Sequence, residues 1–184
     1  MNQRLIWGLL LIALWGCSNG DSANADSETD RFFDVEGYFA GEVDRLQSEQ
    51  PNIQKQVSLN GEEESVQPDT LNFEKELSVF LNSDINKVSW IESYTADTTR
   101  HDDGSIATTT YEAQEEKLRT RLVEVSYEAE APQRIRIINR TENAVLDARQ
   151  ELIYEPAIGF EIQQEQQIRF MKPNQISVAV RFRG

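Results

Sequence analysis

The chain has 184 residues, a formal net charge of −14 and a single cysteine. One cysteine excludes an internal disulfide, and the negative charge disfavours nucleic acid as a partner. The acidity is concentrated, because residues 17–116 carry 6 Lys and Arg against 23 Asp and Glu, whereas residues 117–184 carry 11 against 9. This surface charge also argues against adhesion to anionic lipid.

Residues 1–16 have the composition of a signal peptide. Arg4 gives the start one positive charge, and an apolar run follows from Leu5 to Trp15. A run of this length is too short for a membrane-spanning helix, which needs about 20 residues. A charged start, an apolar middle and a small residue before the cut are typical of a secretory signal. We therefore expect cleavage after Gly16.

The stretch Leu14-Trp15-Gly16-Cys17 resembles the bacterial lipobox, in which the cysteine is acylated and becomes the first residue of the mature protein. Trp15 departs from that pattern, which usually has a smaller residue there. The resemblance implies lipidation of Cys17 and attachment to a membrane of the cell envelope. Ser18 next to the cysteine is similar to lipoproteins of the outer membrane. The alternatives are an incidental cysteine or a Cys17 that pairs with another chain.

Residues 17–30 are small, polar and acidic, and predict a flexible spacer. Residues 31–184 are long enough for one domain with a real core. Apolar residues at spacings of three and four predict an amphipathic helix over residues 30–46. A second helix is expected after Pro68 and Asp69, with an apolar face formed by Leu71, Phe73, Leu77, Phe80 and Leu81.

Strands are predicted around these helices and after them. Ile53 to Leu59 alternates in polarity and leads into Asn60-Gly61, a strong hairpin-turn signal. Further strands are expected at residues 62–67, 88–95, 106–111, 118–128, 134–140, 144–154, 160–170 and 176–182. Short polar turns between alternating strands indicate an antiparallel sheet with one covered face. The expected fold is α+β: an antiparallel β-meander of about seven to nine strands, covered on one face by the two N-terminal helices.

Four stretches carry a resemblance to a known family: "FFDVEGYF", "VSLNGEEE", "FLNSDINKVSWIESY" and "RIRIINRTENAV". With them the chain resembles a family of small, uncharacterised lipoproteins of the Bacteroidetes group of bacteria. The resemblance extends over nearly the whole mature chain. It implies a location and an architecture, and no active site.

Residues suited to catalysis are few. Acylation would consume Cys17, and His101 is the only histidine, placed in a glycine-bearing turn where a catalytic base would lack a fixed position. Asp97, Asp102 and Asp103 could join His101 around a divalent cation, but aspartates in a β-turn need no metal. We expect no catalytic residue, no metal and no cofactor, and hence a protein that is not an enzyme. The alternative is an acid-dependent hydrolase, which should have two carboxylates in a cleft, one of them with a raised pKa.

Arginines at alternate positions form the first candidate binding site. Alternation places the members of each pair on one face of a strand, so three strands could present a basic patch for an anion or an acidic partner. The six residues are Arg119, Arg121, Arg134, Arg136, Arg181 and Arg183. The alternative is cross-strand pairing with carboxylates, for which the candidates are Glu124, Glu128, Glu161 and Glu165.

The second candidate is an apolar stripe that two glutamines interrupt. It could be the wall of a pocket formed by Trp90, Phe160, Ile162, Gln164, Gln166 and Phe170. Buried amides need hydrogen-bond partners, which a ligand could supply. The alternatives are a bulge that shifts the register, or a strand that extends beyond its cover.

These patterns favour a non-enzymatic lipoprotein whose domain binds an envelope protein or glycan by its surface. The alternative is a carrier or receiver of lipids or lipoproteins, with an apolar pocket between a curved sheet and the helices. Only the carrier requires a small apolar ligand. A carrier should have an apolar cavity of several hundred Å³, whereas a binding module should have a filled core and an exposed patch.

Overall fold

The computed structural model describes residues 31–68 and 70–183. The predicted signal peptide, the predicted lipidation site Cys17 and the predicted spacer lie outside the described residues.

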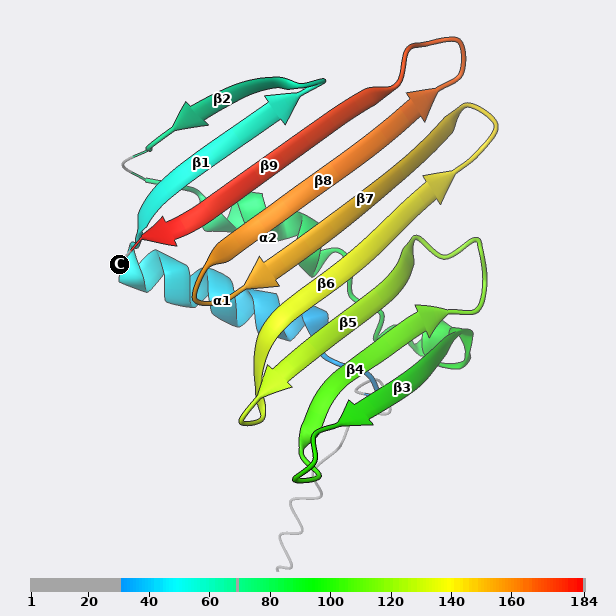
Figure 1. Ribbon diagram of the computed structural model, residues 1–184. Coiled ribbons are helices and arrows are strands. Elements are labelled where there is room, and N and C mark those ends of the chain that lie inside the picture. The colour runs from blue at the N-terminus through cyan, green and yellow to red at the C-terminus, as the bar shows by residue number, and fades with distance from the viewer. Residues whose placement is uncertain (1–30, 69, 184) are drawn as a thin grey trace, which may run out of the picture.

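Nine strands form one antiparallel sheet (Figure 1). In chain order they are β1 (Asn52–Leu59), β2 (Glu62–Val66), β3 (Tyr94–Arg100), β4 (Ile106–Ala113), β5 (Thr120–Glu128), β6 (Ala131–Glu142), β7 (Leu146–Glu155), β8 (Gly159–Ile168) and β9 (Asn174–Arg183). Their spatial order is β2-β1-β9-β8-β7-β6-β5-β4-β3, so β3 to β9 form a meander. The predicted α+β class with an antiparallel sheet is confirmed.

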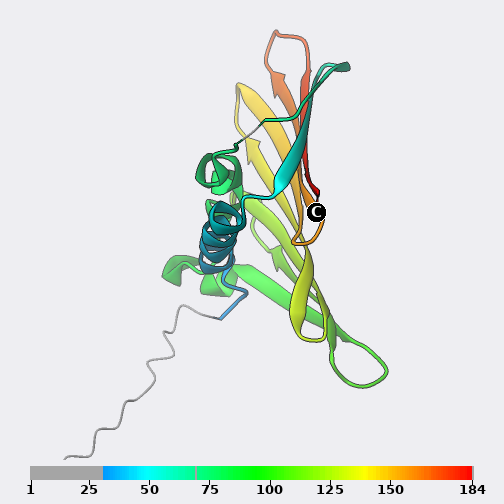
Figure 2. The ribbon, with the colours of Figure 1, turned by 90° about the vertical axis from the view of Figure 1, so that its left-hand side faces the viewer.

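Two helices, α1 (Val35–Glu49) and α2 (Phe73–Leu81), lie on one face of the sheet (Figure 2). Each begins at a side chain that caps the free backbone N–H groups of the first turn. Asp34 accepts a hydrogen bond from the Gly37 N–H at 2.8 Å, and Asn72 accepts one from the Lys75 N–H at 2.9 Å. Among the described residues, no helix lies over the opposite face of the sheet (Figure 2).

The core lies between the helices and the middle of the sheet. Alternate residues of the central strands point into it, and among them Ile135, Ile137, Leu152 and Tyr154 are fully buried. Residues between them point to the open face and are polar or partly exposed. This alternation follows from the two-residue period of a strand.

The first hairpin is placed in the sheet by a contact distant in sequence. β1 pairs with β9, so that Ile53 lies opposite Phe182 and Val57 lies opposite Val178. Asn60 and Gly61 form the predicted turn to β2, and both have positive φ, at 53° and 90°. The last strand of the chain thereby becomes an interior strand.

The segment predicted as a strand over residues 88–95 is mostly helical, which corrects that prediction. Val88–Ser93 is a 3-10 helix, and the strand β3 begins only at Tyr94. The Lys87 ammonium group lies 4.1 Å from the centre of the Trp90 ring, a cation–π contact that helps to hold the short helix. The predicted strand over residues 160–170 also ends earlier, at Ile168.

Candidate functional site

Side chains fill the space between helices and sheet where a carrier would need its cavity. The rings of Phe39 and Tyr154 have centroids 5.1 Å apart, those of Phe39 and Phe80 are 4.7 Å apart, and those of Phe80 and Phe160 are 6.2 Å apart. Such edge-on and tilted contacts are typical of close-packed aromatic cores. Phe160, predicted to line a pocket, is therefore a core residue.

The structure does not bring the six predicted pocket-wall residues together. Ile162 is partly buried against the core, but Trp90 lies on the 3-10 helix beside β3. Phe170 lies in the turn between β8 and β9 and is 93% exposed. Gln164 and Gln166 lie in the last five residues of β8.

The two glutamines belong to a strand that extends past its cover, one of the predicted alternatives. The pairing of β8 with β7 continues without a shift from Gly159 to Ile168, so there is no bulge at Gln164 or Gln166. The end of β8 next to the β8–β9 turn runs beyond α1 and α2 (Figure 2). Polar side chains are therefore tolerated there.

A chain of amide hydrogen bonds joins these glutamines to the core. Asn139 donates to Gln150, Gln150 to Gln164, and Gln164 to Gln166, with donor–acceptor distances of 3.3, 3.3 and 3.4 Å. Asn139 is buried and also donates to the Ser83 hydroxyl at 2.9 Å. One partner, Gln150, thus comes from the neighbouring strand β7, and the two glutamines of β8 bond to each other.

Two of the six candidate arginines bond to backbone carbonyl groups near the start of β5. Arg119 donates to the Asn82 carbonyl at 3.3 Å, and Arg121 donates to the Glu115 carbonyl at 2.8 Å. The register of β5 with β6 shifts between Thr120 and Leu122, so Arg121 lies at a bulge. The expectation that Arg119 and Arg121 lie on one face of a regular strand is therefore wrong.

The other four arginines lie on the open face, and each contacts an acceptor on a neighbouring strand. Arg136 lies 2.6 Å from Glu151, and Arg134 lies 3.9 Å from Glu155. Arg181 pairs with Glu161, and Arg183 donates to the Gln54 side chain. Of the predicted partners only Glu161 forms such a pair; Glu124 lies opposite Arg136 in the strand register. The cross-strand alternative describes this surface better than a basic patch.

The open face therefore presents alternating charges with apolar residues between them. Arg140 and Asp147 are 3.2 Å apart, while Ile138 and Ile153 are half-buried among the charged side chains. Half-exposed ion pairs of this kind contribute little to stability. A surface of alternating charge can select a partner by matching the pattern.

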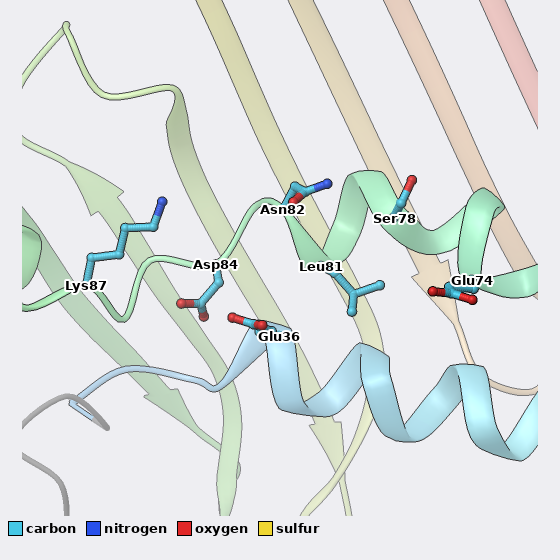
Figure 3. A pocket seen from close by; sticks show the side chains of 7 residues that line it. All are labelled: Glu36, Glu74, Ser78, Leu81, Asn82, Asp84 and Lys87. Carbon is cyan, nitrogen blue, oxygen red and sulfur yellow. The ribbon is translucent and has the colours of Figure 1, made fainter.

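A cleft of about 330 Å³ opens between the start of α1 and the end of α2 (Figure 3). Its lining residues are Glu36, Glu74, Ser78, Leu81, Asn82, Asp84 and Lys87. Asp84 accepts a hydrogen bond from the Asn86 N–H at 3.0 Å through one carboxylate oxygen, and its other oxygen is buried without a partner. The lining offers three carboxylates and one amine, but no nucleophile beside a general base.

The residues around His101 form hydrogen bonds with one another within the β3–β4 turn. The His101 N–H donates to the Ser105 carbonyl at 2.9 Å, and Asp103 accepts from both the N–H and the hydroxyl of Ser105. The Ser105 hydroxyl is the main reason why the pKa of the Asp103 carboxyl is lowered. No group of three or more potential metal ligands occurs among residues 31–68 and 70–183.

Sequence reasoning missed a charged cluster between α1 and the sheet. Arg45 lies 2.7 Å from Glu42 and 2.6 Å from Glu49, and it also donates to the Pro156 carbonyl at 3.3 Å. The Tyr154 hydroxyl donates to Glu42. Burial, with the hydrogen bond to Glu42 second, raises the pKa of the Tyr154 phenol above its usual value. The helical spacing of Glu42, Arg45 and Glu49 was a signal for the two ion pairs.

Comparison with family models, with curated proteins and with solved structures finds no match for this chain. Within the described part of the chain, no helix is long and apolar enough to cross a membrane.

Proposed function

We propose that this chain is a lipid-anchored lipoprotein of the cell envelope, most simply of the outer membrane. Its sheet domain is a non-enzymatic binding module for an envelope protein or glycan. The observation that carries the proposal is the open face of the sheet over β5 to β9, which no helix of the described part of the chain covers (Figure 2). Because the space under the helices is filled by Phe39, Phe80 and Phe160, the surface is the place for a partner.

The chemistry of this face supports recognition by charge pattern. Arg136 and Glu151, and Arg181 and Glu161, form pairs across adjacent strands and leave little net charge. A partner with complementary alternating charges would gain specificity from the register of the pairs. A simple polyanion would meet a carboxylate beside each of these guanidinium groups.

Photo-crosslinking from the open face in intact cells tests the binding module. Benzoylphenylalanine replaces Gln163, an exposed residue of β8 on the open face. The matched control places it at Asp44, an exposed residue of α1 on the helix side. We expect a discrete adduct from position 163 and none from position 44. Identical adducts from both positions, or none from position 163, would refute this use of the face.

The anchor is tested separately by labelling the protein with a fatty-acid analogue during growth. We expect the label on the native chain and its loss in Cys17→Ser, with the mature domain then released from the membrane fraction. Label that persists in Cys17→Ser would rule out lipidation at this cysteine. Because several acyl chains make a lasting anchor, the released fraction should be large.

A lipid carrier remains the second candidate because of a cleft with a partly apolar lining at the rim of the fold. This cleft of about 240 Å³ lies beside the end of α1, with Leu46, Ile53, Leu71 and Phe73 in its lining. Its volume is below the range of about 300–1,000 Å³ that is usual for ligand pockets. Organic extraction of the purified chain from Arg31 onward, followed by mass spectrometry, distinguishes the two. Stoichiometric lipid supports a carrier, and an empty, folded domain supports the binding module.

A further inference from the structure

Exposed apolar residues gather at one end of the sheet, in two neighbouring turns. In the β8–β9 turn Phe170 and Met171 are 93% and 62% exposed, and in the β6–β7 turn Val145 is 60% exposed. The two turns are joined, because the Arg169 N–H donates to the Val145 carbonyl at 2.8 Å. We call Arg169–Lys172 the tip.

The tip is held in one conformation by hydrogen bonds. The Met171 N–H donates to the Ile168 carbonyl at 3.0 Å. The Gln167 side-chain amide donates to the carbonyls of Ile168 and Met171, at 2.9 and 2.8 Å. Binding at this turn therefore costs little conformational entropy, because the turn is already ordered.

Phe170 is an unusual residue for its backbone conformation. Its φ is 67°, in the left-handed region, where a bulky side chain is rare and costs energy. Glycine or asparagine would suit this conformation better and would not expose an aromatic ring. The ring gains little in the free protein, since its described contact is the Arg169 guanidinium group, 4.9 Å from the ring centroid. Strain and exposure at the same residue indicate a role in binding.

The charge at the tip is opposite to that of the whole chain. Arg169 and Lys172 flank the two apolar residues, in a chain with a net charge of −14. In the neighbouring β6–β7 hairpin Glu142 and Asp147 lie 3.0 and 3.2 Å from Arg140, so one guanidinium group faces two carboxylates and the three residues keep a net charge of −1. The tip itself has two positive charges and no carboxylate beside its apolar residues, whereas residues 62–64, three glutamates, follow the β1–β2 turn at the same end of the sheet. The acidity of the chain as a whole therefore confines any contact with anionic lipid to the tip.

These properties fit a lipid bilayer better than a protein groove. A stable protein interface buries about 800 Å² on each partner around an apolar centre, whereas the tip offers a few side chains beside a polar, ion-paired face. A bilayer surface needs no matching shape. It accepts apolar side chains at the level of the acyl chains and attracts Lys and Arg to anionic headgroups. We propose that the tip docks on a bilayer containing anionic lipid, with Phe170 and Met171 inserted and Arg169 and Lys172 among the headgroups.

Docking at the tip would set the orientation of the domain. Arg31, where the described chain begins, bonds to Glu92 beside β3, whereas the tip follows β8 at the far end of the sheet (Figures 1 and 2). The 14 residues from Cys17 to Asp30 can span at most about 50 Å, which exceeds the length of about 33–40 Å of the longest strands. An anchor at Cys17 and a docked tip can therefore engage the same membrane.

The test uses the chain from Arg31 onward, so that its result does not depend on the proposed anchor. Every core residue of the described structure lies between Phe32 and Val180, so this chain keeps the whole described core. Phe170→Trp places a fluorescent reporter at the tip. Ile158→Trp is the matched control, since Ile158 is also exposed but lies in the β7–β8 turn at the other end of the strands. The probes are vesicles of phosphatidylcholine alone and of phosphatidylcholine with phosphatidylglycerol.

We expect the tryptophan at position 170 to shift to shorter wavelength on the anionic vesicles and to be quenched by brominated acyl chains. The tryptophan at position 158 should show neither change. Arg169→Glu combined with Lys172→Glu should weaken vesicle binding by about tenfold or more. Three results would each overturn the proposal. A folded chain does not bind the vesicles, the tryptophans at positions 170 and 158 are quenched equally, or the emission of the tryptophan at position 170 shifts without vesicles when the protein concentration is raised and the chain self-associates. Failure of Cys17 labelling would leave it intact.

Discussion

The hydroxyl of Tyr154 donates a hydrogen bond to the carboxylate of Glu42, although 112 positions separate the two residues in the chain. This bond ties β7 to α1, and Arg45 balances the carboxylate at 2.7 Å. A buried tyrosine needs a partner for its hydroxyl, and a half-buried carboxylate gains from a second donor. The first helix is thus held on the sheet by polar contacts as well as by aromatic packing.

Tyr154→Phe should lower the free energy of unfolding by about 1.5–3 kcal/mol, the usual contribution of a hydrogen bond to a charged group. Urea denaturation measures the change. The control is Tyr38→Phe, because the Tyr38 ring packs 6.3 Å from that of Tyr154 and would be retained. We expect the control to change stability by less than about 0.5 kcal/mol. Equal losses in the two variants would show that the hydroxyl of Tyr154 does not matter.

Phe39→Ala should lower the free energy of unfolding by about 3–5 kcal/mol, because it empties a fully buried site between α1, α2 and β7. Phe170→Ala removes the same ring from the exposed tip and should change stability by no more than about 0.5 kcal/mol. Thermal and urea unfolding of both variants measure the contrast. A large loss in Phe170→Ala would mean that the tip packs against the domain.

Gly159→Ala should be strongly destabilising. Gly159 has a φ of 139°, and an added Cβ would lie 1.9 Å from the Val180 carbonyl oxygen of the neighbouring strand. We expect a loss of about 2 kcal/mol or more in urea denaturation. Gly41→Ala is the matched control. Nothing lies within 4 Å of its added Cβ, so alanine should stabilise α1 by about 0.5–1 kcal/mol.

The protein should lose stability as the pH rises from about 10 to about 12. Tyr94 is buried and donates to the Thr120 carbonyl at 2.7 Å, and its pKa is raised to about 12, chiefly by burial. In the unfolded chain a tyrosine titrates near pH 10. Between these values the native state keeps a proton that the unfolded state has lost, so the free energy of unfolding falls.

Urea midpoints at increasing pH check this expectation. In Tyr94→Phe the lost hydrogen bond should lower the midpoint already below pH 10, but the decline from about pH 10 to about pH 12 should be shallower. An unchanged slope in Tyr94→Phe would assign the alkaline loss to other groups. The remaining buried tyrosines also have raised pKa values and add to the decline in both proteins.

Local signals predicted much of the sheet. Ile176, Val178, Val180 and Phe182 alternate with polar residues, and they form β9 with one face toward the core. Asn60-Gly61 makes the predicted turn. Both features depend on residues close together in the sequence. The strand follows from its two-residue period, and the turn from the low energetic cost of positive φ at asparagine and glycine.

The errors arose where a local pattern had two solutions. Val88 to Ser93 has apolar residues that suit a strand, but it forms a 3-10 helix with Val88 73% exposed. Phe170 continues the apolar stripe of β8 in the sequence, but the turn has already begun at that point. Strand and helix cannot be separated in such short segments by periodicity alone.

The candidate sites depended on contacts that the sequence does not encode locally. Arg136 meets Glu151 because β6 and β7 are adjacent, and Gln164 is satisfied by Gln150 because both lie where the helices no longer cover the sheet. The arginine pairs and the glutamine-interrupted stripe were recognised correctly as unusual. Their roles became clear only from the residues on adjacent strands. In the sequence alone, the arginines fit a basic patch as well as cross-strand pairs, and the glutamines fit a pocket wall as well as a strand beyond its cover.

The sequence by itself determined the antiparallel α+β class, the covered and open faces of the strands and the turn at Asn60-Gly61, because these follow from periodicity and from the φ preferences of single residues. Tertiary structure alone decided that β9 lies beside β1, that Tyr154 meets Glu42, and that the tip stands free of the core. Such contacts join distant residues, and they form only when the burial of the whole core offsets the entropy of closing the long loops between them.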